Sequence, residues 1–388
     1  MIRQAKQGDN WRAINRGNSS CFISQVECVV EGHGASTIDF GKGITAFIGR
    51  NGSRKTTLIR GIYKLLPSTK RNREIKSERS NALAVADATF IDSDNNARKL
   101  SAGQVSVEAL LFDPCSSVPE LRSILRQDEN MEDLFEIGEL RDFTDDELNE
   151  LEFLSGNTYQ KVELVVIEEY NKDFPRFPLY RVERNGVCYD SRDMGYGELS
   201  ILLFHWIMGQ IRECREDGES VVVFLEEPES FISPEYQKRL MSFCADVVAT
   251  CKCQALVVSH SEHIIGRISH SKIQNIRWHA GNIEVSALSR TSEVFEELGL
   301  LPSRKALLVC EDQHSKVLIR ELLRCSSRFG VNEFLIHVVN GDGDVKLSLT
   351  KIPKIIEGFR FIGVLDGDCR NHDWSGFNVC SCVGRRGE

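Results

Sequence analysis

Residues 44–57 read ITAFIGRNGSRKTT, and the rest of the interpretation depends on this stretch. Its first five residues are rich in β-branched and aromatic types, which predicts a buried strand. Residues 56–66 have the pattern of a helix that Pro67 ends. Between strand and helix lies a glycine-rich turn. Backbone amides at such a helix start cradle phosphates, a lysine neutralises them and the next hydroxyl holds Mg²⁺. The stretch therefore predicts a phosphate-binding loop, the alternative being a chance glycine-rich turn.

One position of the loop departs from the usual pattern, because Arg54 stands where glycine precedes the lysine. Glycine there adopts torsions that a residue with a Cβ resists, and it lets the backbone approach the phosphates. We expect a penalty of roughly 1–3 kcal/mol, which weakens nucleotide binding or turnover, although the arginine charge attracts phosphate. The residues expected to contact the nucleotide are Gly49, Asn51, Gly52, Ser53, Lys55, Thr56 and Thr57, with Thr56 also a metal ligand.

Two further strands end in groups suited to hydrolysis. Residues 221–229 read VVVFLEEPE, an apolar run that ends in paired carboxylates. We expect Glu226 to order Mg²⁺ through water and Glu227 to polarise the attacking water. Another buried strand, at residues 255–258, leads to His260, which we expect to contact the terminal phosphate. The alternative is that these groups are solvent-facing, but their order after the loop argues against it.

Residues 193–200, DMGYGELS, open a helix predicted to run to about Arg215. Glycines at a helix N-terminus present amides to an anion, so Gly195, Gly197 and Glu198 are expected to bind a phosphate held by an opposite subunit. Residues 100–104, LSAGQ, are more similar than residues 193–200 to the usual sequence of such a phosphate-binding segment, which is called the signature. They lie far upstream of the acidic strand. Gln104 is interpreted instead as a metal-linked glutamine at the joint of a lobe, which the sequence leaves open.

A second α/β pattern begins near residue 299. The predicted strand, helix, strand, helix and strand cover residues 305–309, 315–325, 334–339, 345–356 and 361–365. This alternation predicts a parallel sheet. Glu311, Asp366 and Asp368 follow strand ends, and carboxylates gathered at one sheet edge can bind divalent metal for phosphodiester hydrolysis.

Residues 22–289 resemble the ABC-type ATPases of the OLD (overcoming lysogenisation defect) and DNA-repair groups. Phosphate loop, signature, acidic strand and histidine occur in that order, and the string at residues 226–229 is similar to the OLD version. The resemblance implies an α/β fold: an ABC-type P-loop ATPase head with a mixed sheet and a helical lobe, then a small parallel TOPRIM-like domain. We expect the head at residues 1–298, with a helical and acidic insert over about 69–160, and the second domain at 299–388. It also implies ATP held head-to-tail between two copies.

By the same resemblance Glu311, Asp366 and Asp368 would hold Mg²⁺ or Mn²⁺. The match is incomplete, since Asp312 replaces an expected glycine, Ser315 an expected acid, and the domain looks short. Two hypotheses therefore stay open. The first is an antiphage ATPase whose nucleotide state controls nuclease action on DNA. The second is a sensor or scaffold that regulates a separate effector nuclease, as in PARIS-like and Septu-like systems. A chromosome-repair ATPase is less favoured without long coiled-coil heptads.

Composition limits the class of protein. The 388 residues are 41% hydrophobic and 27% charged, typical of a soluble globular chain. No apolar run approaches the ~18 residues that span a bilayer, and residues 1–20 lack a secretory signal, so we expect a cytoplasmic protein with no membrane partner. The net charge of −9 does not by itself predict nucleic-acid binding. The thirteen cysteines are interpreted as buried reduced thiols in preference to a metal site.

Overall fold

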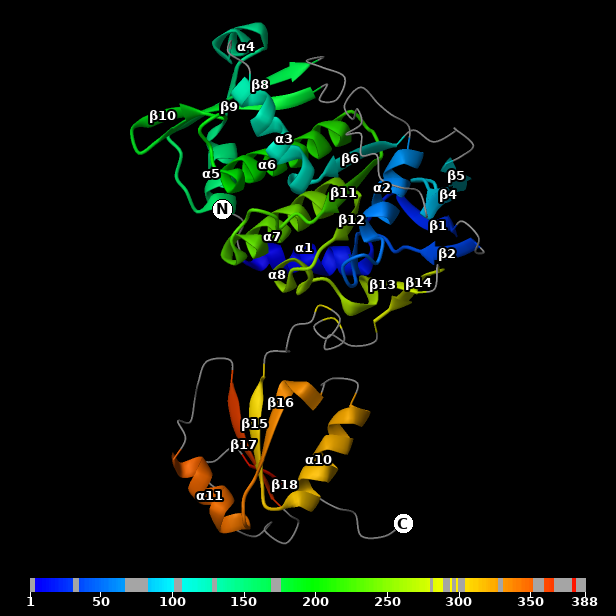
Figure 1. Cartoon of the computed structure of the whole chain (residues 1–388), viewed down its shortest axis with the longest axis vertical. Coiled ribbons are helices and arrows are strands. Elements are labelled where there is room, and N and C mark those ends of the chain that lie inside the picture. Colours follow the sequence, from blue (N-terminus) through cyan, green and yellow to red (C-terminus); the bar gives the residue numbers. More distant parts are fainter. Residues whose placement is uncertain are drawn as a thin grey trace. The chain divides into compact units, whose positions relative to one another are not determined.

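The computed structural model divides the chain into two compact units, Met1–Ala287 and Leu288–Glu388. Each unit has its own sheets and its own apolar core (Figure 1). None of the described helices is long and apolar enough to cross a lipid bilayer. The structure describes residues 4–30, 35–66, 83–100, 107–127, 131–168, 176–279, 282–288, 294, 298, 304–326, 331–351, 359–365 and 379–381.

A six-stranded mixed sheet forms the centre of the first unit, in the order β14-β13-β3-β12-β11-β6. Its neighbours pair in parallel except for the β13–β14 hairpin. Every residue of β3, β11 and β12 is buried, as expected for parallel strands covered on both faces. The strands are β3 (Ile44–Ile48), β6 (Glu108–Phe112), β11 (Val221–Glu226), β12 (Gln254–Val258), β13 (Ile273–His279) and β14 (Asn282–Ala287).

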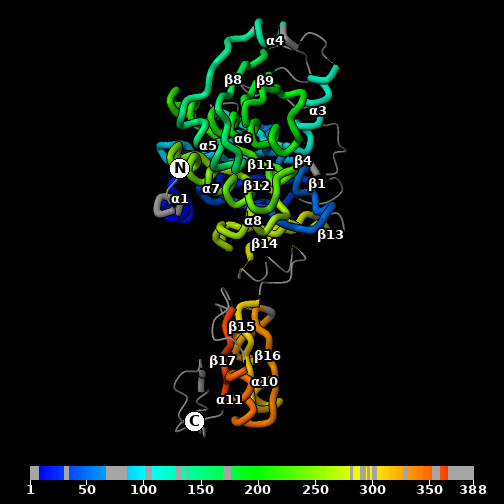
Figure 2. Tube along the Cα trace, turned by 90° about the vertical axis from the view of Figure 1, so that its left-hand side faces the viewer, coloured from blue at the N-terminus to red at the C-terminus, as the bar shows by residue number. Residues whose placement is uncertain are grey.

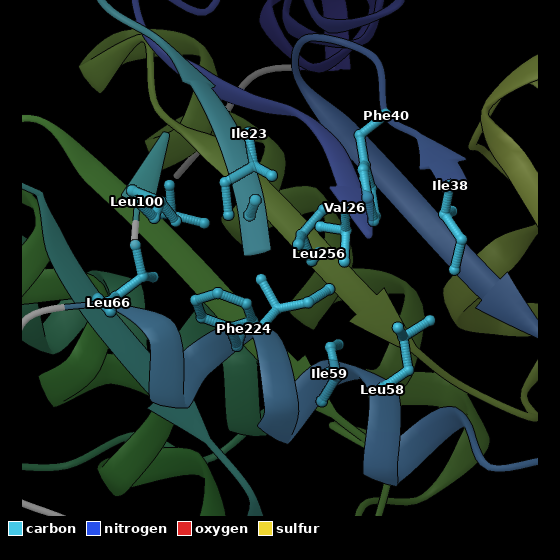
Figure 3. Close-up of a cluster of buried hydrophobic side chains, with 14 of the residues drawn as sticks. Ile23, Val26, Ile38, Phe40, Leu58, Ile59, Leu66, Leu100, Phe224 and Leu256 are labelled. Carbon is cyan, nitrogen blue, oxygen red and sulfur yellow. The ribbon is translucent and has the colours of Figure 1, made fainter. Parts of the chain in front are cut away.

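One face of this sheet packs against α2 (Lys55–Leu65) and an antiparallel sheet of order β2-β1-β4-β5. Figure 3 shows how side chains from these layers meet: Ile23 and Val26 from β1, Ile59 from α2, and Phe224 and Leu256 from the central sheet. All five are almost fully buried. The strands of the antiparallel sheet are β1 (Phe22–Val30), β2 (Ala35–Asp39), β4 (Leu83–Ile91) and β5 (Ala97–Lys99).

Helices cover the other face, where α6 packs against β6 and β11 and against α7 (Figure 1). The N-terminal helix α1 packs on α7, and Asn10 donates a hydrogen bond to Asp246 at 2.7 Å. The short segments α8 and η2 follow β12. These helices are α1 (Gln4–Arg16), α6 (Tyr196–Glu216), α7 (Pro234–Cys251), α8 (Glu262–Ile265) and η2 (His270–Lys272).

The lobe of the first unit combines an antiparallel sheet, β10-β9-β8-β7, with three helices; α4 packs on β8 (Figure 2). Helix α5 begins with a capping box. The Thr144 hydroxyl accepts a hydrogen bond from the backbone amide of Glu147, and the Glu147 carboxylate accepts one from the backbone amide of Thr144. The elements are α3 (Pro114–Gln127), α4 (Met131–Ile137), β7 (Arg141–Asp142), α5 (Asp145–Ser155), β8 (Lys161–Glu168), β9 (Arg176–Arg184) and β10 (Val187–Asp190).

The region expected to be a helical and acidic insert, about residues 69–160, contains the helices α3, α4 and α5 and also strands that the sequence did not predict. Strands β4 and β5 lie in the sheet beside β1, and β6 is the edge strand of the central sheet, next to β11. Short apolar runs such as residues 108–112 have no period that separates strand from helix, so tertiary pairing decides their state. Helix α7 was also not predicted from the sequence.

The second unit is an all-parallel sheet of order β16-β15-β17-β18. Val345 and Leu349 of α11 pack with Val309 on one face, while Ile319 of α10 packs with Leu308 and Val364 on the other. The predicted α/β class, a mixed-sheet head with a helical lobe and then a small parallel α/β unit, is confirmed. The elements are β15 (Ala306–Cys310), α10 (Gln313–Cys325), η3 (Val331–Glu333), β16 (Phe334–Val338), α11 (Asp342–Lys351), β17 (Arg360–Leu365) and β18 (Val379–Ser381).

The capping box generates a local prediction. Thr144→Ala should lower the opening free energy of the first turn of α5 by about 1 kcal/mol, because the Glu147 amide loses its acceptor. Amide hydrogen exchange measures this change. Thr37→Ala, at an exposed position of β2, is the matched control and should leave α5 unchanged. Equal exchange in both variants would show that the box does not stabilise the helix.

Candidate functional site

The glycine-rich turn joins β3 to α2 and requires glycine at its start. Gly49 has φ 146° and Gly52 has φ 81°. A Cβ on Gly49 would collide with the backbone carbonyl oxygen of Ile276 on the neighbouring strand β13. The backbone at Gly49 runs too close to β13 for any side chain. Packing against β13 therefore requires glycine here, in addition to the need for the backbone to approach the phosphates.

Arg54 lies in the left-handed region, with φ 70° and ψ 19°, as the N-cap of α2. This is the conformation that glycine adopts without cost and that an L-residue with a Cβ resists. Its guanidinium carbon lies 5.4 Å from the centroid of the Trp278 ring, so the side chain stacks on β13. The backbone strain expected at this position is present, while the bulk of the side chain is held against Trp278.

The Lys55 side chain is buried inside the loop. Its Nζ donates to the carbonyl oxygens of Gly49 at 2.8 Å and Arg50 at 3.1 Å, and to the Ser53 hydroxyl at 3.3 Å. Burial lowers the pKa of the Lys55 ammonium, and the negative charge of Glu227 opposes that effect. The loop therefore encloses a desolvated cation, the group that a phosphate-binding loop needs.

Glu226, the last residue of β11, is buried. Burial raises the pKa of Glu226 and the nearby Asp113 charge adds to this, while Thr56 and Arg60 lower it. Arg60 Nε donates to Glu226 Oε2 at 2.8 Å, and Arg60 Nη2 pairs with Asp113. Thr56 lies one helical turn before Arg60 on α2, so the two residues expected to hold Mg²⁺, Thr56 and Glu226, are close to each other.

Glu227 and His260 lie beside the loop lysine. Lys55, Glu227 and His260 follow β3, β11 and β12, which pair in parallel as neighbours, so all three lie at the same edge of the sheet, near enough for their charges to interact. Burial and the Lys55 charge lower the pKa of His260, and Glu227 opposes them. Glu227 has a left-handed φ of 45° and donates its backbone amide to the Val258 carbonyl at 2.8 Å.

Glu229 fixes the chain segments that carry Glu227 and His260. Its Oε1 accepts hydrogen bonds from the Ser259 hydroxyl at 2.8 Å and from the His260 amide at 2.9 Å. Burial raises the pKa of Glu229; these bonds oppose that effect, and the Glu227 charge adds to it. The carboxylate ties the end of β11 to the end of β12, so that Glu227 and His260 keep a common position.

The residues of the expected signature segment lie at the start of α6. Gly195 is its N-cap and is exposed, and a Cβ on Gly197 would meet the Phe231 carbonyl oxygen at 2.6 Å. Glu198 Oε1 accepts from the hydroxyls of Tyr159 at 2.8 Å and Tyr189 at 2.7 Å. Glu198 therefore joins the start of α6 to the lobe, and its contact with a nucleotide stays a prediction.

The other predicted residues divide into two groups. Asn51 and Gly52 are exposed on the loop. Ser53 is buried and accepts a hydrogen bond from Lys55, and Thr57 directly follows Thr56 on α2. Gln104, Asp366 and Asp368 lie outside the described residues, whereas Glu311 follows β15. In the described part of the chain no group of three or more His, Cys, Asp or Glu side chains has the arrangement of a metal site.

Sequence reasoning missed Arg60, Asp113 and Cys115. Asp113 directly follows β6, whose apolar sequence was the available signal. Cys115 Sγ lies 3.8 Å from Glu227 Oε2 and 3.0 Å from the Ser230 hydroxyl. The first turn of α3 thus contacts Glu227 through Cys115. Its Ser116 hydroxyl accepts from Arg60, which in turn bonds Glu226.

The residues present fit a magnesium nucleotide. Thr56 and Glu226 supply a hydroxyl and a carboxylate oxygen, the ligand types that Mg²⁺ prefers. Lys55 supplies the phosphate counter-charge, and the amides at the start of α2 supply donors. Loop, lysine, hydroxyl and acids meet at the carboxyl ends of parallel strands, where ligands of open α/β sheets bind.

No family model matches the chain, and no curated protein matches it. A solved Smc head bound to the C-winged helix domain of ScpA is 14% identical, covers 70% of this chain and 99% of its own, and has a TM-score of 0.42. The Smc head domain from Thermotoga maritima is 11% identical over 69% and 98%, at TM-score 0.37. An ATP-binding cassette of an ABC transporter in its ADP conformation is 13% identical over 72% and 94%, at 0.35. These similarities are weak, and function has to be inferred from the geometry of this chain.

The strained loop residue yields a prediction. Arg54→Gly should bind ATP about tenfold more tightly than Arg54→Ala, because only glycine holds the left-handed torsion without cost. Both variants lose the stack on Trp278, so their difference isolates the backbone effect. Titration with a fluorescent ATP analogue measures the dissociation constants. Equal affinities would show that the torsion at residue 54 does not limit binding.

Proposed function

We propose that this chain binds ATP with Mg²⁺ and hydrolyses it. The observation that supports the proposal best is that Lys55, Glu227 and His260 lie at one edge of the parallel sheet, near enough for their charges to interact. These groups come from the loop and from the ends of two parallel strands, β11 and β12. If these acids were ordinary surface residues, they would not be expected to lie next to a buried lysine.

Each residue has a role that follows from its chemistry. Lys55 neutralises the outer phosphates, and Thr56 and Glu226 would hold Mg²⁺, which supplies further charge neutralisation. Glu227 orients the attacking water and accepts its proton. His260, kept neutral by its lowered pKa, donates one ring N–H to the terminal phosphate. The exposed α6 N-terminus at Gly195 would present amides to a nucleotide on a second copy, in a head-to-tail dimer.

Glu227→Gln tests the hydrolytic role. The amide can hold a water but cannot accept its proton, so turnover should fall about 10²–10⁴-fold while ATP binding is kept. Steady-state phosphate release and nucleotide titration measure the two effects separately. Glu235→Gln, at an exposed position of α7, is the control and should leave both unchanged. Full turnover in Glu227→Gln would show that Glu227 does not take part in hydrolysis.

We further propose that ATP turnover serves an antiphage defence system in which nucleotide state controls metal-dependent nuclease action on DNA. In the second unit Glu311 follows β15, and the chain continues from β17, the neighbouring parallel strand, to Asp366 and Asp368. Carboxylates after neighbouring parallel strands share one sheet edge, which supports a Mg²⁺ or Mn²⁺ site there.

A second candidate function is a sensor or scaffold that assembles with a separate effector nuclease. Asp312 favours it, because its carboxylate caps α10 by accepting the Ser315 amide at 2.7 Å. An acid used as a helix cap is already engaged in local structure. The residues at 312 and 315 thus have a structural explanation that needs no metal.

Plasmid DNA distinguishes the two. With Mg²⁺ or Mn²⁺ and ATP, the nuclease hypothesis predicts cutting that Asp366→Ala abolishes, because one metal ligand is removed. Gel electrophoresis of the plasmid forms measures it, with the natural chain in EDTA as control. Cutting only after an added partner protein would instead support the scaffold.

A further inference from the structure

The residue Arg60 lies between two buried carboxylates next to the phosphate loop. Its Nε donates to Glu226 Oε2 at 2.8 Å, and its Nη2 pairs with Asp113 and donates to the Ser116 hydroxyl at 3.2 Å. The side chain is only 17% exposed. Three partners on two elements therefore hold the guanidinium in one orientation, a geometry that the planar fork of arginine suits.

The sheet register brings the two acids together. Strands β11 and β6 pair in parallel with Leu225 opposite Phe112, so Glu226 and Asp113 leave the same sheet edge side by side. Asp113 is 1% exposed and Glu226 is 5% exposed. Two carboxylates buried together repel each other and stay ionised only if a cation compensates them. Arg60 supplies that cation.

The same acids form part of a set that a divalent metal would accept. Thr56 lies one helical turn before Arg60 on α2, on the same side of the helix as the guanidinium that bonds Glu226. Without the guanidinium, the two carboxylates and this hydroxyl would be an oxygen-rich, doubly negative cluster of the kind that binds hard divalent cations. The guanidinium and a metal ion thus compete for the charge of Glu226.

We propose that Arg60 is a resident counter-cation that excludes divalent metal from the Glu226–Asp113 pair in the absence of nucleotide. Arg60 already neutralises the acid pair, so the two acids alone do not hold a metal ion. The metal binds only when phosphate oxygens supply further negative charge and further ligands. Arg60 acts through Glu226 and is a positioning residue, not a catalytic one. This inference rests on the proposed magnesium nucleotide site.

Mn²⁺ binding to the full chain without nucleotide tests the inference, with electron paramagnetic resonance counting free and bound ions. Arg60→Gln and Arg60→Met remove the charge and should each gain one Mn²⁺ per chain, bound at least about tenfold more tightly than by the natural chain. Arg60→Lys keeps the charge and should gain none. Counting additional ions separates this site from any metal bound by the second unit.

The double variant Arg60→Gln with Asp113→Asn should lose the gained ion, because one carboxylate is removed. If the neutral single variants fold only when Mn²⁺ is present, the ion replaces the guanidinium and the inference holds. It is overturned if folded neutral variants bind no additional Mn²⁺, or if variants that do not fold stay unfolded at every Mn²⁺ concentration. Because no ATP is turned over, failure here is distinct from failure of the proposed hydrolysis.

Discussion

The parallel pairing of β3, β12, β11 and β6 is the constraint on which the site depends. Parallel strands end at the same sheet edge, so residues that follow each strand become neighbours whatever their distance in the sequence. This single register gathers the loop lysine Lys55, the acids Asp113, Glu226 and Glu227, and His260. All but Asp113 had been predicted as site residues from their motifs, and the pairing of β6 with β11 supplies the fifth.

The same edge concentrates unfavourable local conformations. Arg54, Glu227 and Phe231 all have positive φ, at 70°, 45° and 66°. Such torsions in residues with a Cβ persist only where the surrounding structure imposes them, and they cluster at functional sites. At Glu227 the imposed bond is to the Val258 carbonyl, and at Arg54 it is the start of α2 together with the stack on Trp278. The burial of the central strands provides the compensating stability.

One set of contacts connects the site to the lobe of the first unit, and another connects the lobe to the start of α6. At one end, the first turn of α3 reaches Glu226 through the Asp113–Arg60 pair and Glu227 through Cys115. At the other, Glu198 at the start of α6 accepts hydroxyls from Tyr159 and Tyr189, and burial with this contact raises the pKa of Tyr189 to about 12. Both connections are polar and directional, so a shift of the lobe would change the position of the acids.

The sequence alone determined the local elements and the chemistry of the site. The phosphate loop and the acidic strand β11 follow from patterns within a dozen residues, because strand period and glycine torsions are local properties. The departure at Arg54 was likewise visible, and the backbone there does adopt the conformation that favours glycine. Only the tertiary structure decided where β4 and β6 pair, that Glu198 fastens the lobe, and that Arg60 bridges Glu226 and Asp113. Those contacts join residues from 9 to 166 positions apart, and long-range pairing depends on which surfaces fit together after folding, which no local pattern encodes.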